Sequence, residues 1–455
     1  MTTRITPRRF SGTVTIPASK SHTIRQLLIA SLADSKSIIR QPLDSDDTRS
    51  CIAACKTFGA EITLREEKDS SKEVRLNSLH VRGVNGFKSS ALKDAKIDAG
   101  NSGTTLFFAL AIAGLQESPI FFTGDEQIQR RSAAPLLDAL AGLGVQSQSN
   151  NGCAPVTIHG GWKGGRVSIS CPTSQYLSAL LIAAPLAPAG IVTEIDVPLL
   201  NEKPYVEMTL SYLKNYLQAS SNKKIYSALE DPEFKIAPDY SHFIIPGGSS
   251  WKAFSGSVPG DFSSAAFPAA AAVITGGRVT ILGLDPEDSQ GDKFFFEMLK
   301  SMGCDVLWNN VDGARQVTVY RDGALRGGTF DLNATPDLLP AAAVTAAFAK
   351  GDTALVNVAH ARIKETDRVA VMAKELSKLG VDCTELPDGL VVHGKGGLPP
   401  GGSVPIIEGH GDHRIVMAFA VAALGSPVPI EITTAECTEV TYPGFWEMLK
   451  GTVNS

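Results

Sequence analysis

A short segment in the C-terminal half, residues 362–368, carries five charges in seven residues. It lies between an apolar run at residues 353–358, which predicts a strand, and a helix-like pattern at residues 369–376. The start of a helix that follows a strand presents backbone N–H groups and the positive end of the helix dipole to an anion. Cations and a carboxylate at such a junction can bind an anionic substrate and move a proton. A solvated surface loop is the alternative, and the segment by itself favours that alternative.

Composition places the chain among ordinary globular proteins. It has 455 residues, of which 43% are hydrophobic and 20% charged, enough for two or three domains. The net charge of −5 argues against a nucleic-acid surface, so a basic site must be a local cluster. Seven cysteines without paired short spacings predict reduced thiols, and the first ten residues lack the apolar core of a signal peptide. We therefore expect a cytoplasmic protein.

One pattern occurs six times along the chain: a short strand, a polar turn and a helix rich in Ala and Leu. The turns are at residues 17–21, 100–104, 171–175, 260–264, 334–337 and 409–414. The helices after them, for example at residues 106–115 and 341–349, are apolar on nearly every side, which is typical of helices buried inside a domain. A more amphipathic second helix follows, as at residues 132–143 and 367–379. The turns are roughly 70–90 residues apart, too far for a solenoid, so the pattern predicts six βαβαββ-like units in an α/β fold.

The turns near the N-terminus carry cations and hydroxyls. Lys20 follows a strand and opens a helix that contains Arg25, so both cations are expected at the mouth of that unit. Thr173, Ser174 and Gln175 offer two hydroxyls and an amide at a helix start. These groups suit phosphate oxygens, and helix capping explains them equally well.

Carboxylates occur at the turns of the C-terminal half. Asp337 and Glu365 belong to two neighbouring units and could form an acid–base pair. An N-cap role for Asp337 is the alternative. The tetrapeptide at residues 411–414 adds a His and an Arg at the last helix start, and as a lone motif it is weak.

Together these segments resemble the 5-enolpyruvylshikimate-3-phosphate synthase family of enolpyruvyl transferases. The resemblance runs in order from Gly12 to Leu449. Its most specific motifs are residues 19–21 with Arg25, residues 43–47, 100–104, 362–368 and 412–414. It implies a two-domain inverse α/β barrel, each domain with three βαβαββ units, and a substrate cleft between the domains. It also implies that residues 1–16 join residues 251–455 in one domain, while residues 17–250 form the inserted one.

The implied reaction transfers the enolpyruvyl group of phosphoenolpyruvate to the 5-hydroxyl of shikimate 3-phosphate, releasing phosphate, without metal or organic cofactor. Asp337 would take the proton of the attacking hydroxyl, Glu365 would protonate the methylene carbon, and Lys20 would be the third catalytic residue. Shikimate 3-phosphate would be held by Ser21, Arg25, Thr173, Ser174, Gln175, Tyr205, Asp337 and Lys364. Phosphoenolpyruvate would be held by Lys20, Asn101, Gly103, Arg131, Gln175, Arg368 and Arg414. Two anionic substrates require several cations, and an Arg side chain binds a carboxylate or phosphate through two parallel hydrogen bonds.

Three positions depart from the family pattern. Phe107 stands where an arginine usually faces phosphoenolpyruvate, and Val440 stands where a lysine is usual. Glu202 replaces a serine that helps to bind the substrate phosphate. Because cations are lost and a carboxylate is gained, we expect weaker binding of phosphoenolpyruvate, of a phosphorylated acceptor and of the inhibitor glyphosate.

Other interpretations stay open. One is a divergent enolpyruvyl transferase with another acceptor, although residues 127–131 lack the cysteine typical of the transferase that uses a UDP-amino sugar. A second is a non-catalytic relative, and a third is a cyclase of terminal RNA phosphates, which the acidic charge balance disfavours. We expect a monomer that binds two small-molecule substrates and neither nucleic acid nor membrane.

Overall fold

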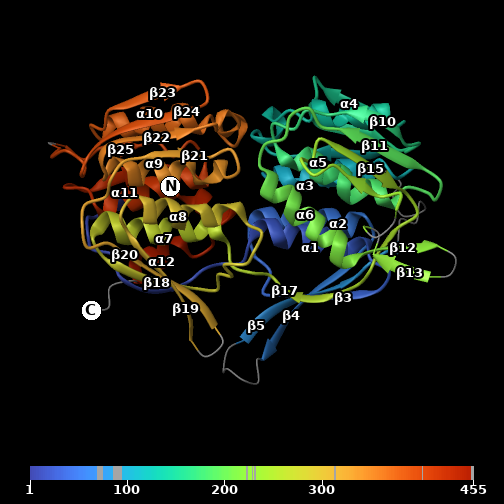
Figure 1. Ribbon diagram of the computed structural model, residues 1–455, viewed down its shortest axis with the longest axis horizontal. Coiled ribbons are helices and arrows are strands. Elements are labelled where there is room, and N and C mark those ends of the chain that lie inside the picture. Colours follow the sequence, from blue (N-terminus) through green and yellow to red (C-terminus); the bar gives the residue numbers. More distant parts are fainter. Residues whose placement is uncertain are drawn as a thin grey trace. The chain divides into compact units, whose positions relative to one another are not determined.

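The computed structural model describes residues 1–451 except 69–74, 86–94, 222–223, 228, 230–231, 312–313 and 402. The chain divides into two compact units (Figure 1). Unit 1 comprises Met1–Ala18 and Pro259–Ser455, and unit 2 comprises Ser19–Val258. Unit 1 is therefore discontinuous, and unit 2 is inserted into it.

The division lies at residues 18/19 and 258/259, not at residues 16/17 and 250/251 as the sequence suggested. Residues 251–258 belong to unit 2 because strand pairing holds them there. Strand β16 (Ser250–Trp251) pairs with β12 (Leu217–Ser221), and β17 (Ser255–Ser257) pairs with β3 (Lys36–Arg40). At the other boundary, β2 (Gly12–Thr15) shortly precedes the start of unit 2 in the chain. It belongs to unit 1, where it pairs with β18 (Arg278–Leu282). These long-range pairings, which a repeat pattern does not reveal, fix where one unit ends and the other begins.

The described part of unit 2 contains three four-stranded sheets. The first has the order β17-β3-β5-β4, with β5 at Arg75–Arg82 and β4 at Glu61–Lys68. The second is β6 (Ala95–Asp98), β7 (Ile120–Thr123), β9 (Cys153–His159) and β8 (Gln146–Asn150). The third is β10 (Gly165–Ser168), β11 (Val192–Asp196), β15 (His242–Pro246) and β14 (Lys235–Ile236). A smaller sheet joins β12 to β16 and β13 (Lys224–Ser227).

Unit 1 follows the same plan over its described residues. Its sheets are β19-β20-β18-β2, β21-β22-β24-β23 and β1-β26-β25. The bounds are β19 Asp305–Val311, β20 Ala314–Tyr320, β21 Thr329–Asp331, β22 Lys350–Val356, β24 Gly389–Lys395, β23 Cys383–Leu386, β1 Thr3–Ile5, β26 Ile430–Ile432 and β25 Ile406–Ile407. Each of these sheets, like the three larger sheets of unit 2, has one parallel pair of strands, and its other neighbouring strands pair antiparallel. The predicted repetition of one unit is therefore confirmed.

The first helix of each repeat is buried inside its unit (Figure 1). In unit 2 these helices are α1 (Lys20–Leu32), α3 (Gly103–Ala113) and α5 (Ser174–Ala183). In unit 1 they are α7 (Phe262–Thr275), α9 (Leu339–Ala347) and α11 (His413–Leu424). Every residue of α3, α9 and α11 is buried, as expected for helices that are apolar all round. The predicted inverse arrangement, with helices inside the sheets, is confirmed.

The second helix of each repeat is more amphipathic. These helices are α2 (Asp46–Thr57), α4 (Ala134–Gly142), α6 (Lys203–Tyr216), α8 (Phe294–Ser301), α10 (Arg368–Lys378) and α12 (Phe445–Gly451). The helices expected at residues 132–143 and 367–379 are α4 and α10, each slightly shorter than predicted. Helix ends commonly differ by a residue or two from a sequence-based expectation.

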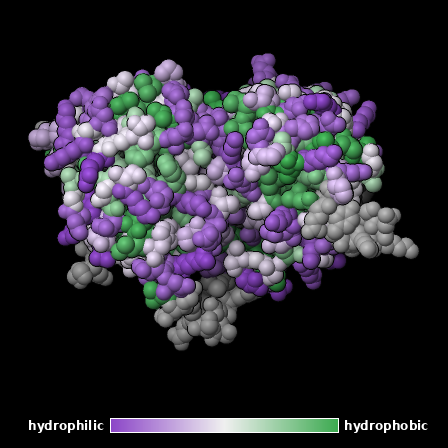
Figure 2. Space-filling model, viewed as in Figure 1, coloured by the Kyte–Doolittle hydropathy of each residue, from purple (hydrophilic) through white to green (hydrophobic). Residues whose placement is uncertain are grey.

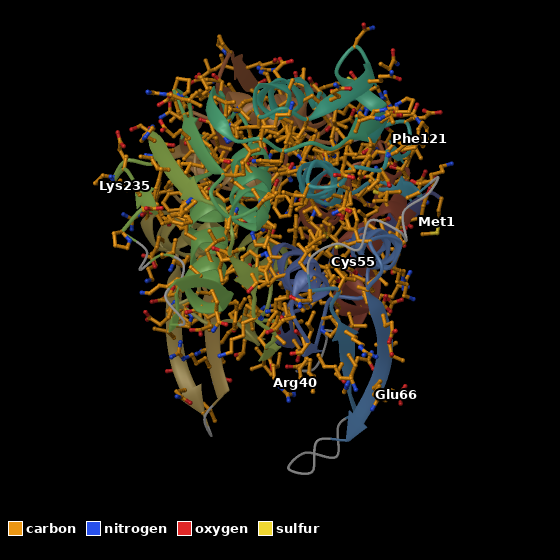
Figure 3. The ribbon with its side chains drawn as sticks, turned by 90° about the vertical axis from the view of Figure 1, so that its right-hand side faces the viewer. Met1, Arg40, Cys55, Glu66, Phe121 and Lys235 are labelled. Atoms are coloured by element: carbon orange, nitrogen blue, oxygen red, sulfur yellow. The ribbon has the colours of Figure 1, made fainter. Side chains whose placement is uncertain are left out.

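The surface and the cysteines agree with the composition. Figure 2 shows a face covered mainly by hydrophilic side chains, with apolar ones in scattered patches. Over the residues described, no helix is both long and apolar enough to cross a bilayer. All seven cysteines are free thiols, as predicted, and Cys55 of α2 lies buried in the body of unit 2 (Figure 3).

The three buried helices of unit 1 pack on one another, and Gly425 lies where their C-terminal ends meet. Gly425 is the C-cap residue of α11. A Cβ atom at this position would lie 2.4 Å from Cγ2 of Ile274 in α7 and 2.8 Å from Cε1 of Phe348, the C-cap residue of α9. The close approach of three apolar helices therefore requires a residue without a side chain.

We predict that Gly425→Ala lowers the free energy of unfolding by about 1–3 kcal/mol, because the methyl group overpacks this junction. Gly323→Ala is the matched control, since a Cβ atom there meets nothing within 4 Å. Urea unfolding followed by circular dichroism measures both changes. Equal stability of the two variants would show that the junction can relax around an added methyl group.

Candidate active site

Three carboxylates from different elements bind one buried guanidinium, that of Arg368 at the first position of α10. Its side chain has no exposed surface. Nε and Nη2 donate to Oδ2 and Oδ1 of Asp412 at 2.8 and 3.2 Å. Nη1 donates to Oδ1 of Asp337 at 2.8 Å, and Nη2 donates to Oε2 of Glu365 at 2.5 Å. The charged segment at residues 362–368 is thus the junction between β22 and α10 that the sequence predicted, and its last residue organises a carboxylate cluster.

The cations of this cluster keep Asp337 and Asp412 ionised. Arg414 donates from Nη2 to Oδ2 of Asp337 at 2.8 Å. Burial works to raise the pKa of Asp337, but the charges of Arg414, Arg368 and Lys364 outweigh it and hold that pKa well below its ordinary value. Burial likewise opposes ionisation of Asp412, and Arg368 lowers the pKa of that carboxyl despite the nearby Glu365. The same three carboxylates raise the pKa of Arg368 well above the ordinary value, against the effect of burial.

Asp292 is a fourth carboxylate of this region, and the sequence analysis missed it. It lies in a 3-10 turn (Gly291–Lys293), is 2% exposed, and accepts a hydrogen bond from the Ser263 hydroxyl of α7. Burial, followed by repulsion from Asp337, raises the pKa of Asp292 to about 7, although Arg414 and Ser263 act in the opposite direction. A Gln-Gly-Asp turn gives no sign in the sequence that its carboxylate will be buried beside another one.

Lys20 and Arg25 both lie on α1, as predicted, with different surroundings. Lys20 is the first residue of α1, and its ammonium lies 3.1 Å from Oδ2 of Asp47 in α2. Arg25 is buried, and its guanidinium donates to the Thr209 hydroxyl at 2.9 Å and to the backbone oxygens of Tyr205 and Ser21 at 3.0 and 3.1 Å. Burial lowers the pKa of Arg25 to about 10. Arg25 therefore ties α1 to α6, and through Ser21 and Tyr205 it positions two residues that were expected to bind the acceptor.

Thr173, Ser174 and Gln175 do begin a buried helix, α5. Thr173 is the N-cap residue and accepts a hydrogen bond from the Gln175 N–H at 3.4 Å, so Thr173 does cap this helix. The Gln175 amide donates to the Thr104 hydroxyl of α3 at 2.8 Å. Glu202, noted only as a departure, directs its carboxylate to this helix start, where Oε2 accepts hydrogen bonds from Ser174 and Thr173.

The start of α3 brings together the other residues expected near phosphoenolpyruvate. Asn101 donates to Oδ2 of Asp125 at 2.6 Å and to Oε1 of Gln127 at 3.0 Å. A Cβ atom on Gly103 would lie 2.7 Å from Nη1 of Arg131, so the missing side chain leaves room for that guanidinium. Phe107 is 3% exposed and packs edge-on against the Tyr176 ring at a centroid distance of 5.0 Å.

The predicted residues therefore form two groups, one in each unit. The group of unit 2 comprises Lys20, Ser21, Arg25, Asn101, Gly103, Arg131, Thr173, Ser174, Gln175 and Tyr205. The group of unit 1 comprises Asp337, Lys364, Glu365, Arg368 and Arg414. Val440 is half-buried at the end of a 3-10 helix (Ala435–Val440) of unit 1. Unit 2 thus offers hydroxyls, amides and cations, and unit 1 offers the carboxylates with their counter-ions.

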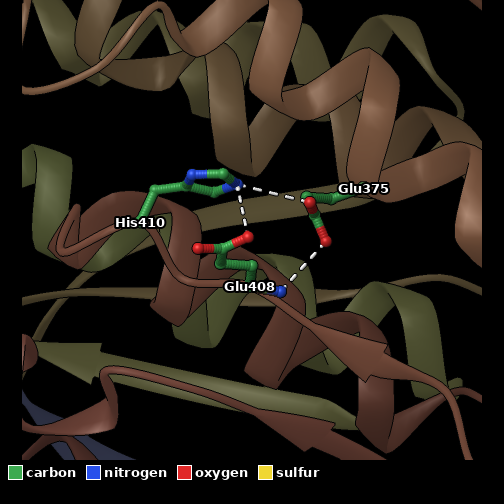
Figure 4. Close-up of side chains that lie close together, drawn as sticks. All are labelled: Glu375, Glu408 and His410. Atoms are coloured by element: carbon green, nitrogen blue, oxygen red, sulfur yellow. Dashed lines mark hydrogen bonds and ion pairs between the residues drawn. The ribbon is translucent and has the colours of Figure 1, made fainter.

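Within the described ranges, one group of side chains has the spacing of metal ligands: Glu375, Glu408 and His410, whose ligand atoms lie within 4.8 Å of one another (Figure 4). The buried Glu375 carboxylate accepts hydrogen bonds from the Lys378 ammonium at 2.7 Å and the Glu408 N–H at 3.0 Å, and from Nε2 of His410 at 3.3 Å. Burial works to raise the pKa of Glu375, and Lys378 with these hydrogen bonds lowers it below its ordinary value. We interpret the group as a structural link between α10 and the loop directly before Asp412, since a metal cation would have to compete with the Lys378 ammonium for Glu375.

Known proteins resemble this chain over nearly its whole length. The family model described as EPSP synthase (3-phosphoshikimate 1-carboxyvinyltransferase) matches residues 5–449. The protein of Acetivibrio thermocellus named 3-phosphoshikimate 1-carboxyvinyltransferase is 43% identical over 454 residues, which cover 99% of this chain and 97% of the relative. The protein of the same name from Methanococcoides burtonii is 40% identical over 447 residues, which cover 96% of this chain and 95% of the relative. A solved structure of EPSP synthase from Acinetobacter baumannii has a TM-score of 0.76 and 26% identity, covering 99% of this chain and 98% of its own. The resemblance predicted from the motifs is confirmed.

The raised pKa of Asp292 predicts a pH-dependent stability. This carboxyl has an ordinary pKa of 3.8 and a folded value of about 7, so the folded state binds its proton more tightly than the unfolded state does. Its contribution to stability is therefore complete below about pH 4 and is lost as the pH rises through about 7. We predict that Asp292→Asn raises the melting temperature relative to the unmodified protein by an amount that grows from pH 4 to pH 7. A constant difference across that range would show that Asp292 is ionised throughout.

Because Glu375 links α10 to the loop before Asp412, we predict that Glu375→Gln lowers the free energy of unfolding by about 1–3 kcal/mol. In this variant Lys378 and His410 lose a charged hydrogen-bond acceptor. Glu297→Gln is the control, since Glu297 is an exposed carboxylate that also pairs with a lysine three residues away. Urea unfolding measures both. If Mn²⁺ instead raises the melting temperature of the unmodified protein and Glu375→Gln abolishes that rise, the group is a metal centre.

Proposed function

The chain belongs to the EPSP synthase family, and we propose that it transfers the enolpyruvyl group of phosphoenolpyruvate to the 5-hydroxyl of shikimate 3-phosphate, releasing phosphate. It is then a transferase of the shikimate pathway. The observation that carries the proposal at the level of the site is the pair of carboxylates, Asp337 and Glu365, on the guanidinium of Arg368. A proton acceptor and a proton donor held at fixed separation are what this reaction requires.

The reaction is an addition followed by an elimination. In the addition, the acceptor oxygen bonds to C2 of phosphoenolpyruvate, the hydroxyl proton passes to Asp337, and C3 gains a proton from Glu365. In the elimination, the bond between C2 and the phosphate oxygen breaks, C3 returns a proton to Glu365, and phosphate departs with the proton that Asp337 had accepted. Its cationic partners keep Asp337 ionised at neutral pH but also make it a weak base, so the acceptor role requires the substrate to take over hydrogen bonds of Arg368 or Arg414.

Phosphoenolpyruvate carries two anionic groups, so we propose several cations for it. We assign Arg368 and Arg414 of unit 1 to this substrate, together with Lys20 and Arg131 of unit 2. Both arginines of unit 1 already bind Asp337, so the substrate would share or exchange these hydrogen bonds. Asn101, Gly103 and Gln175 complete the proposed set, since the glycine leaves room beside Arg131.

The acceptor is assigned to the side chains at the starts of α1, α5 and α6. Ser21, Thr173, Ser174, Gln175 and Tyr205 offer hydroxyls and an amide, and Arg25 fixes the backbone of Ser21 and Tyr205. Lys364 of unit 1 supplies a further cation. These groups fit an acceptor that carries both hydroxyls and a charged substituent.

We propose that the enzyme works in the cytoplasm as a monomer, without metal or organic cofactor. Addition and elimination change no oxidation state, so the reaction needs no redox cofactor, and we assign its proton transfers to Asp337 and Glu365. Seven free thiols fit a reducing compartment.

The departures at Phe107 and Val440 bear on affinity. Phe107 is an aromatic residue that packs against Tyr176, so this position supplies no positive charge for phosphoenolpyruvate. The Arg131 guanidinium next to Gly103 supplies positive charge at the same helix start. We therefore propose a complete reaction with a raised Michaelis constant for phosphoenolpyruvate and reduced inhibition by glyphosate.

The acid–base assignment predicts that Asp337→Asn and Glu365→Gln each lower kcat by about 100-fold or more, while the dissociation constant for shikimate 3-phosphate changes less. The assay is phosphate release from phosphoenolpyruvate and shikimate 3-phosphate. Asp352→Asn is the control, an exposed carboxylate of unit 1 whose side chain is 68% accessible. Near-normal turnover in both variants would remove these carboxylates from the mechanism, and no phosphate release by the unmodified protein would remove the proposed function.

A further inference from the structure

The carboxylate of Glu202 occupies a built anion site at the start of α5. Its Oε2 atom accepts three hydrogen bonds: from the Ser174 N–H at 2.9 Å, from the Ser174 hydroxyl at 2.8 Å and from the Thr173 hydroxyl at 3.1 Å. All three residues are buried, with exposures of 2% for Glu202, 7% for Thr173 and 1% for Ser174. A backbone N–H and two hydroxyls that converge on one oxygen at a helix N-terminus are the donors that a phosphate oxygen also requires.

The residue that makes this contact has an unfavourable backbone conformation. Glu202 has φ 59° and ψ 40°, in the left-handed region that side-chain-bearing residues seldom adopt. It stands at the N-cap position of α6, and its carbonyl oxygen accepts a hydrogen bond from the Tyr205 N–H at 3.0 Å. Its own side chain makes no capping bond to α6. The carboxylate is directed instead at the residues that the proposed function assigns to the acceptor.

We propose that Glu202 is a specificity-determining residue that disfavours a phosphate on the acceptor by filling, with its own carboxylate, the subsite that this phosphate would take. The inference rests on the proposed function, since it concerns the acceptor of that reaction. A phosphate that enters must displace the carboxylate from Ser174 and Thr173, or lie beside it and be repelled. An acceptor with a neutral hydroxyl at the same position meets no such repulsion and can donate a hydrogen bond to the carboxylate.

Two substitutions separate the charge of Glu202 from its bulk. Glu202→Gln keeps the size and one acceptor oxygen and removes the charge, whereas Glu202→Ser removes both and leaves a hydroxyl. We expect each to lower the dissociation constant for shikimate 3-phosphate by about 10- to 100-fold, a tenfold change being about 1.4 kcal/mol, and to change that for unphosphorylated shikimate by less than about threefold. Glu207→Gln is the matched control, because Glu207 is an exposed carboxylate of the same helix.

Calorimetric titration with shikimate 3-phosphate, shikimate and inorganic phosphate gives these constants without any need for turnover. Unchanged or weaker binding of shikimate 3-phosphate by both Glu202 variants, with normal melting temperatures, overturns the inference and leaves Glu202 as a structural link between α5 and α6. A phosphate-release assay on the same samples tests the proposed function separately. Tighter binding in the variants without phosphate release in any sample supports the role of Glu202 and refutes the reaction.

Discussion

The arrangement of the proposed catalytic carboxylates depends on the buried guanidinium of Arg368. Three carboxylates share it, and its charge helps to keep Asp337 and Asp412 ionised against the effect of burial. Removing one member of a buried ion network typically costs about 3–5 kcal/mol, because the remaining charges are left uncompensated. Asp412 extends the network into the fold, since it also accepts the Arg414 N–H as the N-cap residue of the buried helix α11. The geometry of the proposed catalytic carboxylates and the start of α11 in unit 1 therefore depend on the same contacts.

In both units, the chain's own carboxylates occupy groups that are suited to anionic ligands. In unit 1, Asp337 holds both Arg368 and Arg414. In unit 2, Glu202 holds the donors at the start of α5. The two cases have different consequences. Displacement of Asp337 from a guanidinium would leave a base beside the substrate, as the proposed chemistry requires, whereas displacement of Glu202 would gain nothing for the chemistry and only weaken binding.

Much of the fold could be predicted from the sequence because its signals are local. Helices such as α3 and α11 are apolar on all sides, and this pattern predicted their burial. The turns before the buried helices predicted where Lys20 and Ser174 lie, and the charged junction before α10 predicted where Glu365 lies. What could not be predicted depends on contacts between residues far apart in the chain. The pairing of β17 with β3 moved the boundary between the units, and the approach of Asp292 to Asp337 follows from helix packing. Arg25 appeared in the sequence as a cation for the acceptor, and only the structure shows its guanidinium bound to Thr209 and to backbone oxygens.

The residues that begin the buried helices differ between the two units in a way that matches the proposed division of roles. In unit 2 the N-cap residues of α1, α3 and α5 are Ser19, Ser102 and Thr173, which are neutral. Neutral caps leave the positive ends of these helix dipoles for an anionic ligand. In unit 1, α7 and α11 begin at Asp261 and Asp412, so negative charge neutralises these helix ends and attracts cations. Glu202 is the exception to this division, because it brings a carboxylate to a neutral cap of unit 2. A single residue, the N-cap of the neighbouring helix α6, thus gives the start of α5 in unit 2 the electrostatic character of the helix starts in unit 1.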